Sequence, residues 1–223
     1  MCSSDLSAHR QGRRVSTAPS TAPLPPERLA VWLAAYEQRV AALAAAQGER
    51  ACRRLGVPVP PGVGRAWHGA RAAWLGQPAP LSRFGAHANR LALLDGDALR
   101  RVLAALRLYP ARGALRRIVS GTQRRALAGA VGEQAFDVLQ RLGMQAPGAE
   151  AAPPADAAAL ATAGHAMLVA DGALPLEVAA RLVALTLHGA PDARPAQPAA
   201  PGATAPFLVD AVLIFPEFTW LFG

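Results

Sequence analysis

The sequence predicts an all-α protein, on three observations. Apolar residues make up 52% of the 223-residue chain, and they are mostly Ala and Leu, which favour helix, whereas β-branched residues are sparse. Several stretches space their apolar residues three and four positions apart, as an amphipathic helix does. Pro, Gly, Ser and Asp stand where these stretches begin and end. We therefore expect an irregular multi-helix globular domain of about eight to ten short helices with Pro/Ala-rich linkers.

The N-terminal part of the chain is expected to be a tail followed by a helix. Residues 1–25 are rich in Ser, Thr, Pro and Arg, which predicts a disordered tail. Residues 1–6 resemble the translation of a common sequencing-library adapter, so we attach no function to residues before about Pro25. Pro25 and Pro26 then open a helix that we expect to run to about Gln47, because Gly48 can end it, with a further turn or two over residues 49–55 as the alternative.

The main helical domain is expected over residues 26–143. Its Pro and Gly density predicts a loop at residues 56–66, and a short helix at residues 67–75 follows. Asp95 and Asp97 precede a helix that we expect to run to about Tyr109. Two aspartates flanking a glycine at such a place are interpreted as helix caps rather than as a general acid and base.

Short helices fill the rest of that domain and the C-terminal third. Pro110 suits the start of one helix, Ser120 to Thr122 suit a C-cap followed by an N-cap, and a helix pair ends at Gly143. Asp156 is expected to cap a helix that runs to about Ala170, and residues 174–188 form a second strong helix. The predicted segments after the main domain are a linker at 144–155, a helical pair at 156–189, a second linker at 190–206 and an apolar C-terminal segment at 207–223.

No recognisable signature of catalysis, cofactor binding or metal binding occurs in the sequence. The 5 histidines never stand three or four residues apart, and Cys2 and Cys52 form no Cys-x-x-Cys pair. The glycine-rich nucleotide motifs and the nucleophile elbow are also missing. We therefore expect no catalytic, cofactor-binding or metal-binding residues, no small-molecule substrate, and a protein that is not an enzyme.

The basic charge of the chain leaves two interpretations open. The net charge is +8, and every basic residue other than histidine is arginine. The abundance of Arg, Ala, Gly and Pro indicates GC-rich coding, which weakens the usual inference from charge to nucleic acid. A small basic helical nucleic-acid-binding protein stays the alternative, although few aromatic residues stand among the arginines to stack on single-stranded bases.

Two groups of residues are candidates for binding a protein partner. Arginines of the central helices suit bidentate contacts with carboxylates, and the alternative is a solvated face. Aromatic residues gather in the C-terminal segment, where they form either a docking element or part of the protein's own core, because each ring buries about 150–250 Å². The candidates are Arg100, Arg101, Arg107, Arg116, Arg117, Phe215, Phe218, Trp220 and Phe222.

Parts of the chain also resemble a known family. They lie in the first predicted helix, in the centre and at the C-terminal end: Leu33-Ala34-Ala35-Tyr36-Glu37, residues 96–101, Leu115-Arg116-Arg117-Ile118, Gly121, Arg125-Ala126-Leu127, Val131-Gly132-Glu133, Phe215-Pro216-Glu217 and Trp220-Leu221-Phe222-Gly223. Together these motifs resemble the K component of bacterial type III secretion machines, the SctK/YscK/PscK family with its Hrp-type counterpart in plant-associated bacteria.

The resemblance implies a helical, non-enzymatic adaptor of the sorting platform. Its partners would be the cytoplasmic domain of the SctD-type inner-membrane ring protein and the SctQ-type pod protein, with no nucleic acid expected. The implied location is the cytoplasm, at the cytoplasmic face of the inner membrane and reached through those partners. The sequence fits this location, since it has neither a signal peptide nor the roughly 20 uninterrupted apolar residues of a membrane span.

Overall fold

The computed structural model describes residues 25–58, 71, 74–76, 80–145, 155–191, 193 and 202–223. Within these ranges it contains ten α-helices and four short 3₁₀ helices, and none of the described residues forms a strand. The prediction of an all-α, multi-helix fold is confirmed. Outside the described residues lie the predicted tail before Pro25, most of the two predicted linkers and much of the predicted helix at 67–75.

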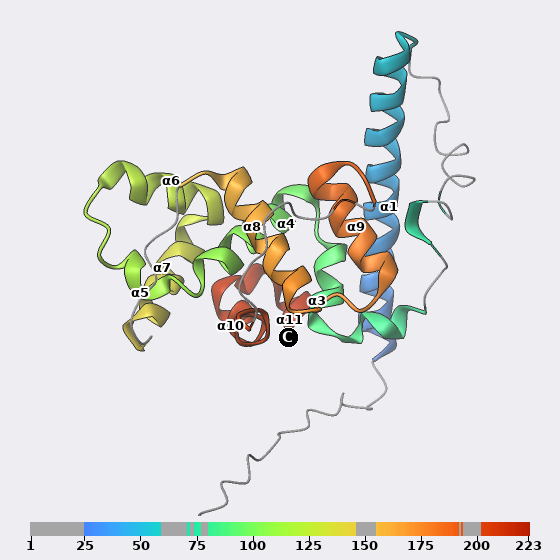
Figure 1. Cartoon of the computed structure of the whole chain (residues 1–223). Helices are drawn as coiled ribbons and strands as arrows, with labels where there is room; N and C mark the ends of the chain where they lie inside the picture. The colour runs from blue at the N-terminus through green and yellow to red at the C-terminus, as the bar shows by residue number, and fades with distance from the viewer. Residues whose placement is uncertain are drawn as a thin grey trace, which may run out of the picture.

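Helix α1 spans Pro26–Leu55 and stands upright at one end of the molecule (Figure 1). Pro26 occupies its first turn, and Gly56 ends it in a left-handed conformation with φ of 66°. The predicted end at Gly48 is wrong, because the helix runs through that glycine. A glycine inside a helix costs only about 1 kcal/mol relative to alanine, and good helix formers flank it on both sides.

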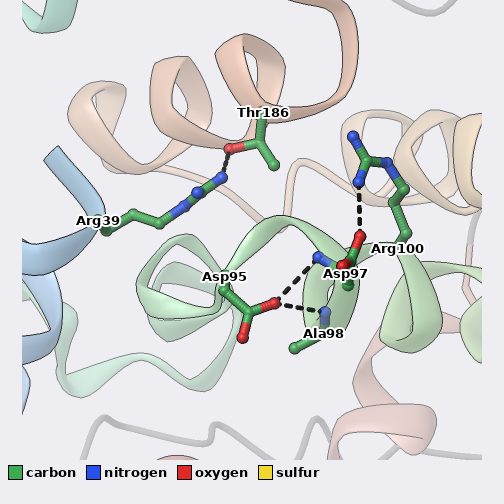
Figure 2. A network of polar contacts seen from close by, with 6 residues as sticks. All are labelled: Arg39, Asp95, Asp97, Ala98, Arg100 and Thr186. Atoms are coloured by element: carbon green, nitrogen blue, oxygen red, sulfur yellow. Dashed lines mark hydrogen bonds and ion pairs between the residues drawn. The ribbon is translucent and has the colours of Figure 1, made fainter. Parts of the chain in front are cut away.

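Helix α4, Gly96–Leu108, lies at the centre of the molecule. It follows three short elements: η1 (Leu81–Gly85), α3 (His87–Arg90) and η2 (Leu91–Leu93). Leu99, Val102, Leu103 and Leu106, spaced three and four positions apart on one face of this helix, are fully buried. Asp95 caps this helix as predicted, because its Oδ1 accepts hydrogen bonds from the backbone N–H groups of Asp97 (3.0 Å) and Ala98 (2.8 Å) (Figure 2).

Three helices build the end of the molecule opposite α1 (Figure 1). They are α5 (Arg112–Leu115), α6 (Gly121–Val131) and α7 (Glu133–Leu142), and η3 (Gly143–Gln145) follows. Ser120 is the N-cap of α6, since its hydroxyl accepts a hydrogen bond from the Gln123 N–H at 3.3 Å. Helices α6 and α7 are joined through Gly132, whose φ of 94° favours glycine. Helices α5, α6 and α7 therefore fold as a tight cluster of short helices.

The C-terminal third of the chain packs across the middle of the molecule. Helix α8, Ala157–Ala170, begins after the predicted cap Asp156 and lies along α4, while α9, Glu177–His188, lies beside α1 (Figure 1). Helix α9 starts three residues later than predicted, after Leu176. The chain ends with α10 (Thr204–Ile214), η4 (Pro216–Phe218) and α11 (Thr219–Phe222).

A continuous core joins these elements. Its buried residues run from Trp32 in α1 through α4, α8 and α9 to Phe222 in α11. No single helix in the described ranges is long and apolar enough to cross a membrane. Helix α10 and the segment Pro216–Phe222 pass that length and composition test only as a pair bent by 101°. The phenylalanines of this pair lie in the core, as described next.

Candidate protein-docking surface

The aromatic candidates of the C-terminal segment lie inside the fold. Phe215, Phe218 and Phe222 are 1%, 9% and 5% exposed, and Trp220 is half-buried. The docking element that the sequence offered as one alternative is therefore corrected: these rings fill the protein's own core. The physical reason is that α10, η4 and α11 close the lower side of α3 and α4 (Figure 1).

Polar contacts fasten this C-terminal segment to the first helices. The guanidinium of Arg90 donates to the carbonyl oxygens of Phe84 (2.9 Å), Gly85 (2.5 Å) and Leu221 (2.6 Å), and it stacks 4.5 Å from the centre of the Trp32 ring. Burial, followed by the nearby Arg28, lowers the pKa of Arg90 to about 10. Because the charge remains at neutral pH, Arg90 acts as a charged clamp between η1 and α11.

The arginines of α4 do not form one exposed face. Arg100 pairs with Asp97 on its own helix at 3.0 Å (Figure 2), whereas Arg101 reaches Glu217 of η4 at 3.6 Å and lies 5.7 Å from the centre of the Phe218 ring. Arg107 is half-buried and also interacts within the protein. Arg100 and Arg101 therefore pair with different elements, and all three predicted candidates have interactions within the protein.

A basic hollow of about 340 Å³ opens between the short helices at the end opposite α1. Arg116, which follows α5, faces Arg124 of α6 and Arg141 of α7 across it. Arg116 is a predicted candidate, but its neighbour Arg117 is exposed outside the hollow. Arg124 and Arg141 were not among the candidates. The hollow is lined by Arg116, Arg124, Asp137, Gln140, Arg141 and Met144.

The walls of this hollow are held by packing and hydrogen bonds. The side chain of Gln140 donates to the carbonyl oxygen of Leu115 at 3.1 Å, which joins α7 to the end of α5. Gly143 lies so close to the backbone carbonyl of Arg112 that a Cβ there would overlap it. These contacts fix α5 against α7 and η3, and α6 also packs against α7, so the three arginines are presented by a preformed scaffold.

An apolar groove of about 320 Å³ continues from the basic hollow. Its lining comes from Val138, Arg141 and Leu142 of α7 and from Leu213 of α10, and Arg141 lines both hollows. Leu213 is 58% exposed, Val209 one turn earlier on α10 is 72% exposed, and Met144 is 66% exposed. We call the whole the α7–α10 surface: Arg116, Arg124, Val138, Arg141, Leu142, Met144, Val209 and Leu213.

The charge on this surface is unbalanced. Among the described residues, Asp137 is the only carboxylate that lines either hollow, and it pairs with Arg124 at 3.6 Å. Arg116 and Arg141 form no ion pair with any carboxylate in the described ranges. The surface therefore presents guanidinium groups beside uncovered apolar side chains, which is an arrangement suited to binding an acidic, partly apolar ligand.

A second exposed surface lies at the far end of α1. The helix is held by α9 as far as Gln47, whose side chain donates to the Gly189 carbonyl oxygen at 3.2 Å. Beyond this point Arg53, Arg54 and Leu55 are exposed, with Leu55 at 75%. We call these last three residues the α1 tip. It stands at the opposite end of the molecule from α7, whereas α10 lies near the middle (Figure 1).

The remaining polar clusters serve the fold. His165 of α8 and His188 of α9 approach with Nδ1 and Nε2 3.1 Å apart, and burial followed by His188 lowers the pKa of His165 to about 4. Arg39 of α1 is buried and donates to the hydroxyl of Thr186 of α9 (Figure 2). Among the residues that the structure places, no group of three or more His, Cys, Asp or Glu side chains could hold a metal ion.

Comparison with known proteins gives one match. The model of a family described as bacterial type III secretion protein (HrpB4) matches residues 23–217, which is most of the chain and includes both exposed surfaces. The comparisons with curated proteins and with solved structures give no significant match.

Proposed function

The chain belongs to the HrpB4 family of bacterial type III secretion proteins, and we propose that it is a non-enzymatic adaptor of the secretion sorting platform that links the inner-membrane ring protein to the pod protein. The family match carries this proposal, because it extends over residues 23–217 and agrees with the resemblance of the sequence motifs to SctK-type proteins. The proposed location is the cytoplasmic face of the inner membrane, reached through the two partners.

The shape of the molecule supports a linking role. A protein that joins two others needs two surfaces that can be occupied at the same time. The α1 tip lies at one end of the structure and α7 near the other, with the α4–α8 pair between them, while the α10 part of the α7–α10 surface lies near the middle (Figure 1). The two surfaces share no residue, so each can serve a different partner.

The titratable residues near the centre also support docking rather than catalysis. Asp95 accepts two backbone hydrogen bonds as a helix cap, and Asp97 is paired with Arg100. The two aspartates that could have been imagined as general acid and base thus stabilise the start of α4.

The test is reconstitution of the complex from purified full-length chain. We would mix it with the cytoplasmic domain of its cognate ring protein, with the pod protein, and with both, and measure masses by size-exclusion chromatography with light scattering. We expect two binary complexes and one ternary complex. No complex with either partner would overturn the adaptor proposal, and two binary complexes that exclude each other would overturn the linking role.

The net charge of +8 favours a second candidate function, nucleic-acid binding. That candidate predicts micromolar or tighter binding of duplex or single-stranded DNA at about 150 mM salt, which weakens steeply as salt is raised. The same column experiment with DNA in place of the partners decides between the two functions.

A further inference from the structure

We propose that the α7–α10 surface docks an acidic amphipathic segment of one of the platform partners. The apolar face of that segment would cover Val138, Leu142 and Leu213, and its carboxylates would meet Arg116, Arg124 and Arg141. This inference rests on the proposed adaptor function, because it takes its partner from the same assembly.

The first argument is the apolar groove. Val138 and Leu142, one turn apart on α7, and Leu213 of α10 line one apolar groove, and the exposed Val209 stands one turn before Leu213 on α10, outside the groove lining. Val209 and Leu213 are mostly exposed to water, which an isolated protein gains nothing from. Contiguous exposed apolar side chains with a polar rim are typical of binding sites, and a groove between two helices accepts an amphipathic segment.

The second argument is charge complementarity. Among the residues that the structure describes, three guanidinium groups line the basic hollow against a single carboxylate, that of Asp137. The Arg124–Asp137 pair is half-exposed on both sides, and such a pair contributes at most about 1 kcal/mol. A partner carboxylate can therefore take over Arg124 at little cost, while Arg116 and Arg141 have no carboxylate to give up among the described residues.

The third argument favours a protein segment over nucleic acid. Phosphates could neutralise the arginines, but they would leave the apolar groove with Leu213, and the exposed Val209, uncovered. No aromatic ring lines either hollow, so bases would find nothing to stack on. An acidic amphipathic segment can pair with the arginines of the basic hollow and cover the apolar groove at the same time. Arg141 lines both hollows, so it sets where the acidic and the apolar side chains of that segment lie relative to each other.

Preorganisation adds to this fit. The hydrogen bond from Gln140 to Leu115 and the close approach of Gly143 to Arg112 hold the arginine-bearing elements together before any partner arrives. Binding therefore requires little rearrangement of the backbone of these elements.

The experiment uses the full-length chain with the cytoplasmic domain of the cognate ring protein and with the cognate pod protein as probes. Arg141→Glu and Leu213→Ser change the charged and the apolar half of the surface. Arg117→Glu and Val119→Ser are matched controls, because both residues are exposed nearby and line neither hollow. We expect each test variant to weaken the same one of the two complexes by about tenfold or more, and each control by less than about threefold.

A second measurement identifies the bound segment without relying on charge reversal. The photo-crosslinking amino acid p-benzoylphenylalanine replaces the exposed Met144, and mass spectrometry identifies the partner peptide that it captures. The expected peptide is rich in Asp and Glu and has apolar residues three and four positions apart. A basic or neutral peptide overturns the proposal.

The outcomes separate this inference from the adaptor function. If both complexes form and all four variants bind like the wild type, the docking surface is refuted and the adaptor function stands. If neither complex forms, the adaptor function fails and this inference fails with it. If Arg141→Glu abolishes binding of a duplex DNA probe and leaves both protein complexes intact, the occupant of the surface is nucleic acid and the proposal is overturned.

Discussion

The backbone of Gly164 in α8 lies directly against the carbonyl group of Leu103 in α4. A Cβ at Gly164 would overlap the Leu103 oxygen and come within 2.7 Å of its carbonyl carbon. Only glycine lets the two helices approach this closely. Helices α4 and α8 form the centre of the molecule (Figure 1), and this contact sets how closely they approach each other there.

Gly164→Ala should therefore destabilise the protein. Alanine gains about 1 kcal/mol in helix propensity, but forcing α8 away from α4 should cost more, for a net loss of about 2–3 kcal/mol in the free energy of unfolding. Gly129→Ala in α6 is the control, because nothing lies within 4 Å of the added Cβ. It should be neutral or stabilising in urea unfolding. A Gly164→Ala protein as stable as the Gly129→Ala protein would contradict the close approach.

Arg90→Lys should also destabilise the fold. Lysine keeps the charge but cannot donate in a planar fork to Phe84, Gly85 and Leu221, and it loses the stacking on Trp32. We expect a loss of about 2–3 kcal/mol, because several hydrogen bonds of a buried charge are broken. Arg83→Lys, at an exposed position of η1, should change stability by less than about 0.5 kcal/mol. If the Arg90→Lys and Arg83→Lys proteins are equally stable, the contacts of Arg90 do not hold η1 and α11 together.

The His165–His188 pair should make stability depend on pH. The pKa of His165 is about 4 in the folded protein against 6.5 as its ordinary value, so the unfolded chain binds the extra proton between these limits. Stability is complete above about pH 6.5 and falls as the pH drops toward 4. From pH 7.5 to 5 the loss should be about 1–2 kcal/mol. It should shrink in a His165→Gln variant, and an unchanged pH dependence in that variant would assign the effect to other groups.

Local features of this fold could be predicted from the sequence because they depend on neighbouring residues alone. Asp95, Ser120 and Asp156 cap helices through their own side chains, and the spacing of the apolar residues in α4 defines its buried stripe. The end of α1 was predicted wrongly. Treating Gly48 as a helix end ignores that glycine inside a helix costs only about 1 kcal/mol relative to alanine, which the helix formers around it outweigh.

The docking surface could not be predicted, because it is made by tertiary packing. Arg116, Arg124 and Arg141 come from three segments that meet only when α5, α6 and α7 fold together. Arg100 and Arg101 are neighbours in the sequence, but Arg100 pairs with Asp97 of α4 and Arg101 pairs with Glu217 of η4. Of the predicted arginines only Arg116 lines the basic hollow, so the sequence indicated this region of the chain but not which side chains come together there.

The two aspartates before α4 should differ in their effect on stability. Asp95→Ala removes both hydrogen bonds to the first turn of α4 and should cost about 1 kcal/mol. Asp97→Ala removes only an exposed pair with Arg100, which contributes little. Thermal unfolding of both variants measures the difference. A larger loss for Asp97→Ala would mean that Asp95 is not the effective cap.

Phe215→Ala and Leu213→Ala should separate the core from the docking surface. The Phe215 ring is 1% exposed and stacks 5.8 Å from the centre of the Phe218 ring, so its removal should cost about 3–5 kcal/mol in the free energy of unfolding. Leu213 is mostly exposed, and its removal should leave stability nearly unchanged while weakening partner binding. Urea unfolding and the affinity for the two platform partners are measured on both variants, at a temperature where both are folded. Since the ring faces inward, the folded Phe215→Ala protein should keep its affinity, and a stable variant that loses affinity instead would return the C-terminal aromatic residues to the role of a docking element.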